Sequence, residues 1–135
     1  MCHGFAGELS KAELHVHLEG TIEPVDMVSF AQRNDVMLPW TAPNELRAAY
    51  TYTGLADFLR LYRQGCQVLC TRTDFYDLAL NYLRRVSDQG VRWAELPFAP
   101  QNFLPRGVTI ADQLGGITAA IEDARTSWGI ERPWS

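Results

Sequence analysis

Residues 12–18 alternate between apolar and polar side chains near the start of the chain. The even positions are apolar, and the odd positions through residue 19 carry a carboxylate or an imidazole: Glu13, His15, His17 and Glu19. Alternation with a period of two predicts a β-strand, whose successive side chains point to opposite faces. Both imidazoles would leave the same face, about 7 Å apart along the backbone. One divalent cation can bridge two such rings, so the strand is either a metal site or a plain polar strand face.

Helical periodicity follows in two stretches before the middle of the chain. A helix is predicted from Pro24 to about Asn34, and a loop marked by Pro39 and Pro43 comes after it. The next helix carries an i, i+3, i+4, i+7 apolar stripe, which we expect to pack on one side: Leu55, Phe58, Leu59, Tyr62, Cys66 and Leu69.

A longer helix is predicted from about Thr73 to Gln89. Thr71 and Asp74 have the spacing of a capping box, and Gly90 suits a left-handed stop. Residues 91–98 read as a second strand, which ends at prolines.

The last predicted helix begins at a Thr109-x-x-Asp112 capping signal and ends at Gly129. Its apolar positions are Ile110, Leu114, Ile117, Ile121 and Ala124, and the pair Gly115-Gly116 weakens its helix propensity. The order strand, helices, strand, helix predicts an α/β fold with parallel strands and helical crossovers.

Composition narrows the class of protein. Of 135 residues, 47% are hydrophobic and 21% charged, as in ordinary globular domains. A net charge of −4 does not indicate the basic surface that binds nucleic acid. No apolar run is long enough for a membrane span. No signal peptide is visible, and three cysteines fit a reducing compartment, so we expect a cytoplasmic protein with free thiols at Cys66 and Cys70.

Several separated blocks of this sequence resemble one known family. Residues 11–24 resemble the N-terminal signature of the adenosine/adenine deaminase family, the metal-dependent purine aminohydrolases. The resemblance continues in residues 55–62, 74–79 and 90–95, and extends from Lys11 to about Gly129.

The resemblance implies a fold, a metal and a reaction. The chain would be the N-terminal part of a (β/α)8 TIM barrel, with zinc held by His15 and His17 at the end of the first strand. Such enzymes convert adenine or adenosine to hypoxanthine or inosine and release ammonia. Zinc lowers the pKa of bound water toward 7, which makes hydroxide available at neutral pH.

The resemblance also implies contacts with a small-molecule purine. Glu19 matches the position that reaches the substrate beyond the metal, and a glutamate there favours the free base because it fills the space of a ribose. Its alternative role is a carboxylate at the start of a helix. Four apolar or aromatic residues match a helical lid over the purine: Leu55, Phe58, Leu59 and Tyr62. Alternatively, these residues only pack in the core of the protein, as most amphipathic helices do.

Two departures limit what the chain can do. After the second strand the related proteins carry an acidic or hydroxyl residue and then a histidine, and residues 99–103 lack both. The only histidines are His3, His15 and His17, so neither a third zinc histidine nor a catalytic histidine exists, and no catalytic residue is assigned.

The length of the chain adds a further expectation. A (β/α)8 barrel takes about 250 residues, and this sequence offers about two of eight strands plus crossover and lid helices. We expect one partial domain over residues 1–135, with a flexible lead at 1–10, a family-like region at 11–129 and an atypical tail at 130–135. It would be an inactive fragment. The alternative is a non-catalytic metal- or partner-binding module, and a PHP-type phosphoesterase is a third candidate because it also begins with His-x-His.

Overall fold

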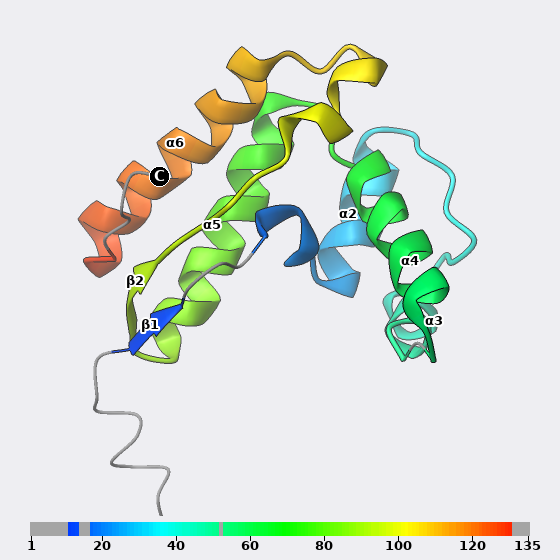
Figure 1. The fold of residues 1–135 in the computed structure, drawn as a ribbon, viewed down its shortest axis with the longest axis horizontal. Coiled ribbons are helices and arrows are strands. Elements are labelled where there is room, and N and C mark those ends of the chain that lie inside the picture. The colour runs from blue at the N-terminus through cyan, green and yellow to red at the C-terminus, as the bar shows by residue number, and fades with distance from the viewer. Residues whose placement is uncertain (1–10, 14–16, 52, 131–135) are drawn as a thin grey trace, which may run out of the picture.

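The computed structural model describes residues 11–13, 17–51 and 53–130 (Figure 1). Its sheet has two strands, β1 (Lys11–Glu13) and β2 (Val91–Ala94), which pair in parallel with Ala12 opposite Trp93. The helices between the strands make the crossover that parallel pairing needs. The predicted α/β arrangement with parallel strands is therefore confirmed. The flexible lead and most of the tail lie outside the described residues.

Among the described residues, four α-helices lie between the strands and one follows them. They are α2 (Pro24–Arg33), α3 (Pro43–Ala49), α4 (Leu55–Gln67), α5 (Arg72–Asp88) and α6 (Ile110–Trp128). The described part of the chain also contains three short 3-10 helices: η1 (Leu18–Gly20), η2 (Pro100–Asn102) and η3 (Leu104–Arg106). No helix among the described residues combines the length and apolar character that crossing a membrane requires.

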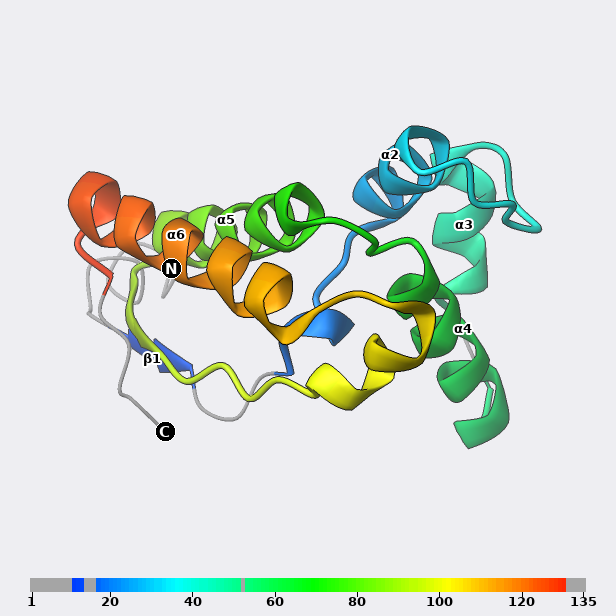
Figure 2. The ribbon, with the colours of Figure 1, turned by 90° about the horizontal axis from the view of Figure 1, so that it is seen from above.

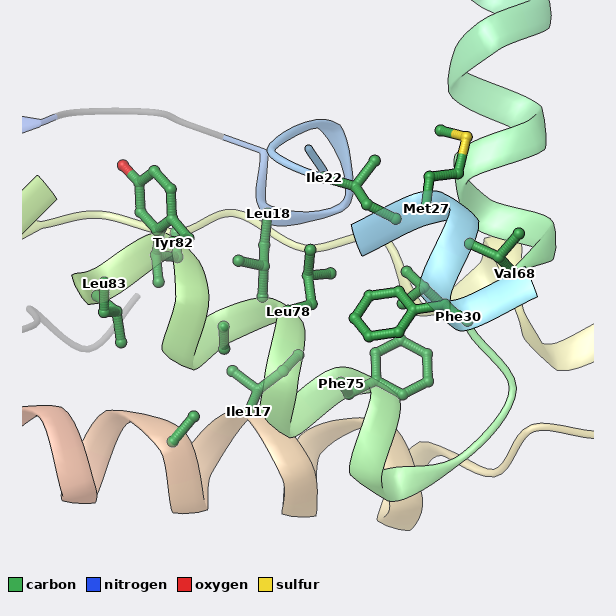
Figure 3. Close-up of a cluster of buried hydrophobic side chains, with 14 of the residues drawn as sticks. Leu18, Ile22, Met27, Phe30, Val68, Phe75, Leu78, Tyr82, Leu83 and Ile117 are labelled. Atoms are coloured by element: carbon green, nitrogen blue, oxygen red, sulfur yellow. The ribbon is translucent and has the colours of Figure 1, made fainter. Parts of the chain in front are cut away.

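Helix α5 is the centre of the packing. Helices α5 and α6 lie side by side, the paired strands lie at one end of α5, and α2, α3 and α4 gather toward the other (Figures 1 and 2). Figure 3 shows Leu18 of η1 beside Leu78 of α5, with Ile117 of α6 on the far side of that helix. All three side chains are buried, so α5 joins the start of the chain to its last helix.

The predicted caps are present. The Thr71 side chain accepts from the Asp74 backbone N–H and the Asp74 carboxylate accepts from the Thr71 N–H, which completes the capping box. Thr109 caps α6 in the same way through the N–H of Asp112. Gly90 and Gly129 adopt the left-handed φ values of 86° and 68° that were expected of helix stops.

The first strand is shorter than predicted. The strand is described up to Glu13, and residues 14–16 lie outside the described residues. Leu18, which was expected in the strand, belongs to η1. Pairing toward the second strand nevertheless continues, because the Leu18 N–H donates to the Pro97 carbonyl at 3.2 Å. The η1 turn forms at Leu18 in place of the predicted strand, because Thr21 donates to the Leu18 carbonyl through both its N–H and its hydroxyl. The second strand also ends early, at Ala94.

Helix α3 was wrongly predicted as loop. Proline is typical of loops, which is why Pro43 predicts one. It is also favoured in the first turn of a helix, where its missing N–H costs nothing, and Pro43 begins α3. Leu46 then anchors the helix because its side chain is completely buried.

Two predicted apolar stripes are shifted from the faces that the structure buries. On α4, Cys66 is buried as expected, but Leu55 is 71% exposed and the buried face includes Leu61. On α6, Ile110 and Leu114 are exposed, whereas Ile117 and Ala124 are buried as predicted. A stripe of apolar residues indicates a helix correctly, but the facing surface decides which residues it covers.

Candidate functional site

Glu19 is placed by the η1 turn, which begins directly after His17. The Gly20 N–H donates to the His17 carbonyl at 3.0 Å, and the turn draws the Glu19 side chain into the protein, where its exposure is 0%. A buried carboxylate needs compensating donors. Oε1 has one, whereas Oε2 is buried without a hydrogen-bond partner among the described residues.

The donor to Glu19 is the phenol of Tyr62, from the middle of α4. The Tyr62 hydroxyl donates to Oε1 of Glu19 at 2.7 Å, and the Asn102 amide donates to the Tyr62 oxygen at 3.1 Å. Burial raises the pKa of Tyr62, and its bond to the negative Glu19 raises it further, so the phenol keeps its proton at neutral pH.

A small pocket of about 100 Å³ opens beside this pair. Its lining is mostly apolar and comes from η1, the helices α2 and α4, and the end of α3: Glu19, Gly20, Ile22, Met27, Tyr50, Phe58, Leu61 and Tyr62. Tyr50 is fixed there because its hydroxyl donates to the Ile22 carbonyl at 2.7 Å. Apolar walls with one carboxylate are typical of a pocket for a flat, partly polar ligand.

His17 lies at the edge of this site. Its side chain is 53% exposed, and its Nδ1 is 3.9 Å from Oε1 of Glu19. His15, the other predicted zinc ligand, lies outside the described residues. No group of three or more metal-ligating side chains occurs in the described part of the chain, so that part alone does not complete a metal centre.

The two cysteines among the described residues are free thiols, as predicted. Cys66 is buried below Tyr62 and Cys70 is half-buried. Burial raises the pKa of Cys66 to about 12, and the negative charge of Glu19 adds to this effect. Cys66 therefore stays protonated at neutral pH and is a poor metal ligand, because metals bind the thiolate.

The loop after β2 supplies polarity that its sequence did not predict. Phe103 is completely buried. Its ring stacks on that of Phe98, with 5.6 Å between the ring centroids, and makes an edge-to-face contact with Phe75, with 5.0 Å between the centroids. This anchor holds the neighbouring Asn102 against Tyr62. Residues 99–103 lack the acidic, hydroxyl and histidine groups expected from related proteins, but the Asn102 amide places a hydrogen-bond donor beside the pocket.

Comparison with known proteins places this site in context. Residues 10–133 match the Adenosine deaminase family. The chain belongs to the adenosine deaminase family. Over 123 residues it is 50% identical to an adenine deaminase of Bordetella avium, covering 91% of this chain and 39% of that protein.

Solved structures agree with this membership of the adenosine deaminase family. The crystal structure of an adenine deaminase from Arthrobacter aurescens matches with a TM-score of 0.84 and 38% identity, over 90% of this chain and 37% of that one. An amidohydrolase from Burkholderia ambifaria with bound Zn matches with a TM-score of 0.83 and 27% identity, over 96% and 36%. The chain thus spans less than two-fifths of the length of these relatives.

Within this family member, the predicted substrate residues fall into two groups. Glu19, Phe58 and Tyr62 line the same pocket, whereas Leu55 and Leu59 are absent from its lining and are 71% and 36% exposed. Sequence reasoning did not identify three further side chains at this site: Leu61, Tyr50 and Asn102. Leu61 and Tyr50 lie outside the apolar stripe, and no local pattern marks Asn102, which reaches Tyr62 only through the tertiary fold.

Proposed function

We propose that the pocket between Glu19 and Tyr62 holds the ring of a 6-aminopurine, as part of a zinc-dependent purine aminohydrolase. The buried carboxylate of Glu19 carries this proposal, because Oε2 has no hydrogen-bond partner among the described residues. A buried acceptor without a partner costs about 1–3 kcal/mol or more. A ligand N–H supplied at this point would recover that cost.

The preferred purine is the free base. In this proposal the long side chain of Glu19 would occupy space that a ribose needs, and its carboxylate would accept a hydrogen bond from a ring N–H. The volume of about 100 Å³ and the Tyr50 wall leave a small chamber that suits a flat heterocycle. The reaction in which such a site takes part joins adenine and water and yields hypoxanthine and ammonia.

His15 and His17 would hold the metal, and the described His17 has the exposed imidazole that this role needs. When bound, zinc supplies a hydroxide source at neutral pH. Glu19, two residues later, would orient the purine next to it. The parallel pair β1 and β2 with its crossover helices supports an origin in the first part of a (β/α)8 barrel, a fold that carries its active sites at the carboxyl ends of the strands.

Adenine should bind to the 135-residue chain more tightly than adenosine, and E19Q should weaken adenine binding about 10- to 100-fold. The physical reason is the loss of a charged acceptor for a ring N–H. Isothermal titration of both ligands against wild type and E19Q measures the effect. E45Q is the matched control, because Glu45 lies on α3 and bonds to Thr41 away from the pocket. Equal affinities for adenine and adenosine would overturn the choice of the free base.

Zinc binding should depend on both proposed ligands. H15A and H17A are each expected to weaken zinc affinity at least about tenfold, because two imidazoles share one ion. Competition with a chromophoric chelator measures this affinity. H3A serves as the control, and a loss in H3A as large as in H17A would assign the zinc to an adventitious site.

The 135-residue chain is expected to release no ammonia from adenine or adenosine, even with zinc added. Catalytic zinc normally has three protein ligands and a water, and this sequence offers only three histidines, of which two belong to the proposed site. A coupled ammonia assay with purified protein checks this. Turnover above the rate without protein would show that the described pocket is catalytically sufficient.

A further inference from the structure

Three polar side chains from distant parts of the sequence form one chain of hydrogen bonds. Asn102 of η2 donates to the Tyr62 oxygen at 3.1 Å, and Tyr62 of α4 donates to Oε1 of Glu19 at 2.7 Å. A phenol has only one proton to donate. Because Asn102 occupies the phenol oxygen as a donor, the Tyr62 proton is directed toward Glu19.

The two outer members of this chain are held firmly. Glu19 is completely buried in η1, and the neighbouring Phe103 fixes Asn102 from the core. Arg106 ties the same loop to the carboxyl end of α4, since its guanidinium donates to the carbonyls of Cys66 at 2.6 Å and Leu69 at 3.0 Å. Tyr62 therefore lies between two residues that are each held in place by the surrounding fold.

We propose that Asn102 and Tyr62 are positioning residues, which fix the orientation of the Glu19 carboxylate beside the pocket. The family resemblance implies that Tyr62 is part of a lid in contact with purine, whereas this geometry uses its hydroxyl to hold Glu19. The inference rests on the proposed function for the identity of the ligand. The orientation of Glu19 itself does not depend on that function.

The arrangement also explains why one carboxylate oxygen is satisfied and the other is not. Oε1 receives the phenol, and Oε2 is buried with no partner among the described residues. The hydrogen bond from Tyr62 favours one orientation of the carboxylate over the others. That orientation is set before a ligand arrives, which reduces the ordering cost of binding.

The first experiment reads the hydrogen bonds without any ligand. Tyrosine labelled at the phenol carbon Cζ gives five nuclear magnetic resonance signals, and Y62F identifies that of Tyr62. We expect both E19Q and N102A to shift the Tyr62 signal. D123N is the matched control, because Asp123 accepts from the Tyr76 hydroxyl on the α5–α6 side, and it should shift the Tyr76 signal alone. A Tyr62 signal unchanged in E19Q would overturn the proposal.

The second experiment asks whether Tyr62 acts on the ligand through Glu19. Y62F should weaken adenine binding about tenfold in the wild type, but less than about twofold in an E19A background, because no side-chain oxygen is then left for Tyr62 to orient. N102A should behave like a weaker Y62F, N102Q should restore part of the affinity, and Y76F should change nothing. A full tenfold loss from Y62F in the E19A background would mean that Tyr62 contacts the ligand directly, and would overturn the proposal.

The two experiments separate the two proposals. If the wild-type chain binds no adenine, the proposed ligand is wrong, and the Tyr62 signal alone decides whether Asn102 and Tyr62 orient Glu19. If adenine binds but the double-mutant coupling is absent, the proposed function stands and the positioning role fails.

Discussion

Replacing Asp74 with alanine should lower the free energy of unfolding by about 3 kcal/mol, a large part of the 5–15 kcal/mol that typically stabilises a domain. Asp74 is completely buried at the start of α5 and accepts hydrogen bonds from four donors. They are the Arg33 guanidinium, the Asn34 amide at 2.8 Å, and the backbone N–H groups of Cys70 at 2.9 Å and Thr71 at 2.8 Å.

The size of this effect follows from what the substitution leaves behind. Alanine would remove the acceptor of two backbone N–H groups at the α4–α5 turn and would also release the end of α2. Each buried donor without a partner costs about 1–3 kcal/mol. D77A is the matched control, since Asp77 pairs with the same Arg33 at 2.8 Å but is part-exposed, and such pairs contribute at most about 1 kcal/mol. Urea unfolding followed by circular dichroism measures both variants, and equal losses in D74A and D77A would contradict the argument.

The contribution of Asp74 should also depend on pH. Burial alone would raise its pKa, but the hydrogen bonds from Cys70, Thr71, Asn34 and Arg33 outweigh burial and hold the pKa of Asp74 below its ordinary value. A lowered pKa in the folded state means that the carboxylate stabilises the fold above the unfolded pKa of about 4. This stabilisation is lost as the pH falls through the lower pKa of the folded state. The difference between wild type and D74N should therefore shrink below about pH 4.

Much of the fold follows from local chemistry. The capping box at Thr71, the cap at Thr109 and the stop at Gly90 are all visible in the sequence, because each depends on residues within one turn. The parallel pairing follows from the order of the elements. Local signals did not locate the exact strand ends, because the Thr21 bonds that close η1 compete with the alternating pattern.

The candidate site was predictable only in part, for a physical reason. Glu19 and Tyr62 occur in sequence blocks that carry the family resemblance, whereas Asn102 contributes through a contact 40 residues away along the chain. Leu55 and Leu59 share the stripe of Phe58 but face away from the pocket, since a helix of 13 residues turns part of any wide stripe outward. Residues that meet only through tertiary packing produce no periodic pattern in the sequence.

Gly115 and Gly116 show the same difference between local propensity and packing. The pair weakens the propensity of α6, because glycine is less favourable than alanine in a helix interior by about 1 kcal/mol. In the folded protein, however, α6 lies directly against the first turn of α5 (Figure 2). A Cβ at Gly116 would collide with the Arg72 carbonyl oxygen and would come within 2.9 Å of the Tyr76 backbone nitrogen and 3.1 Å of the Phe75 Cβ.

G116A should therefore lower the free energy of unfolding by about 2–3 kcal/mol, despite the gain in helix propensity, because backbone atoms of α5 cannot step aside as a side chain can. G115A is the matched control. A Cβ there would meet the Arg72 guanidinium, with Cζ at 2.8 Å, and this flexible side chain can swing into solvent. G115A should consequently be neutral or stabilising by up to about 1 kcal/mol. Urea unfolding of the two variants measures the contrast, and a G116A protein as stable as G115A would show that α5 and α6 are not in close backbone contact.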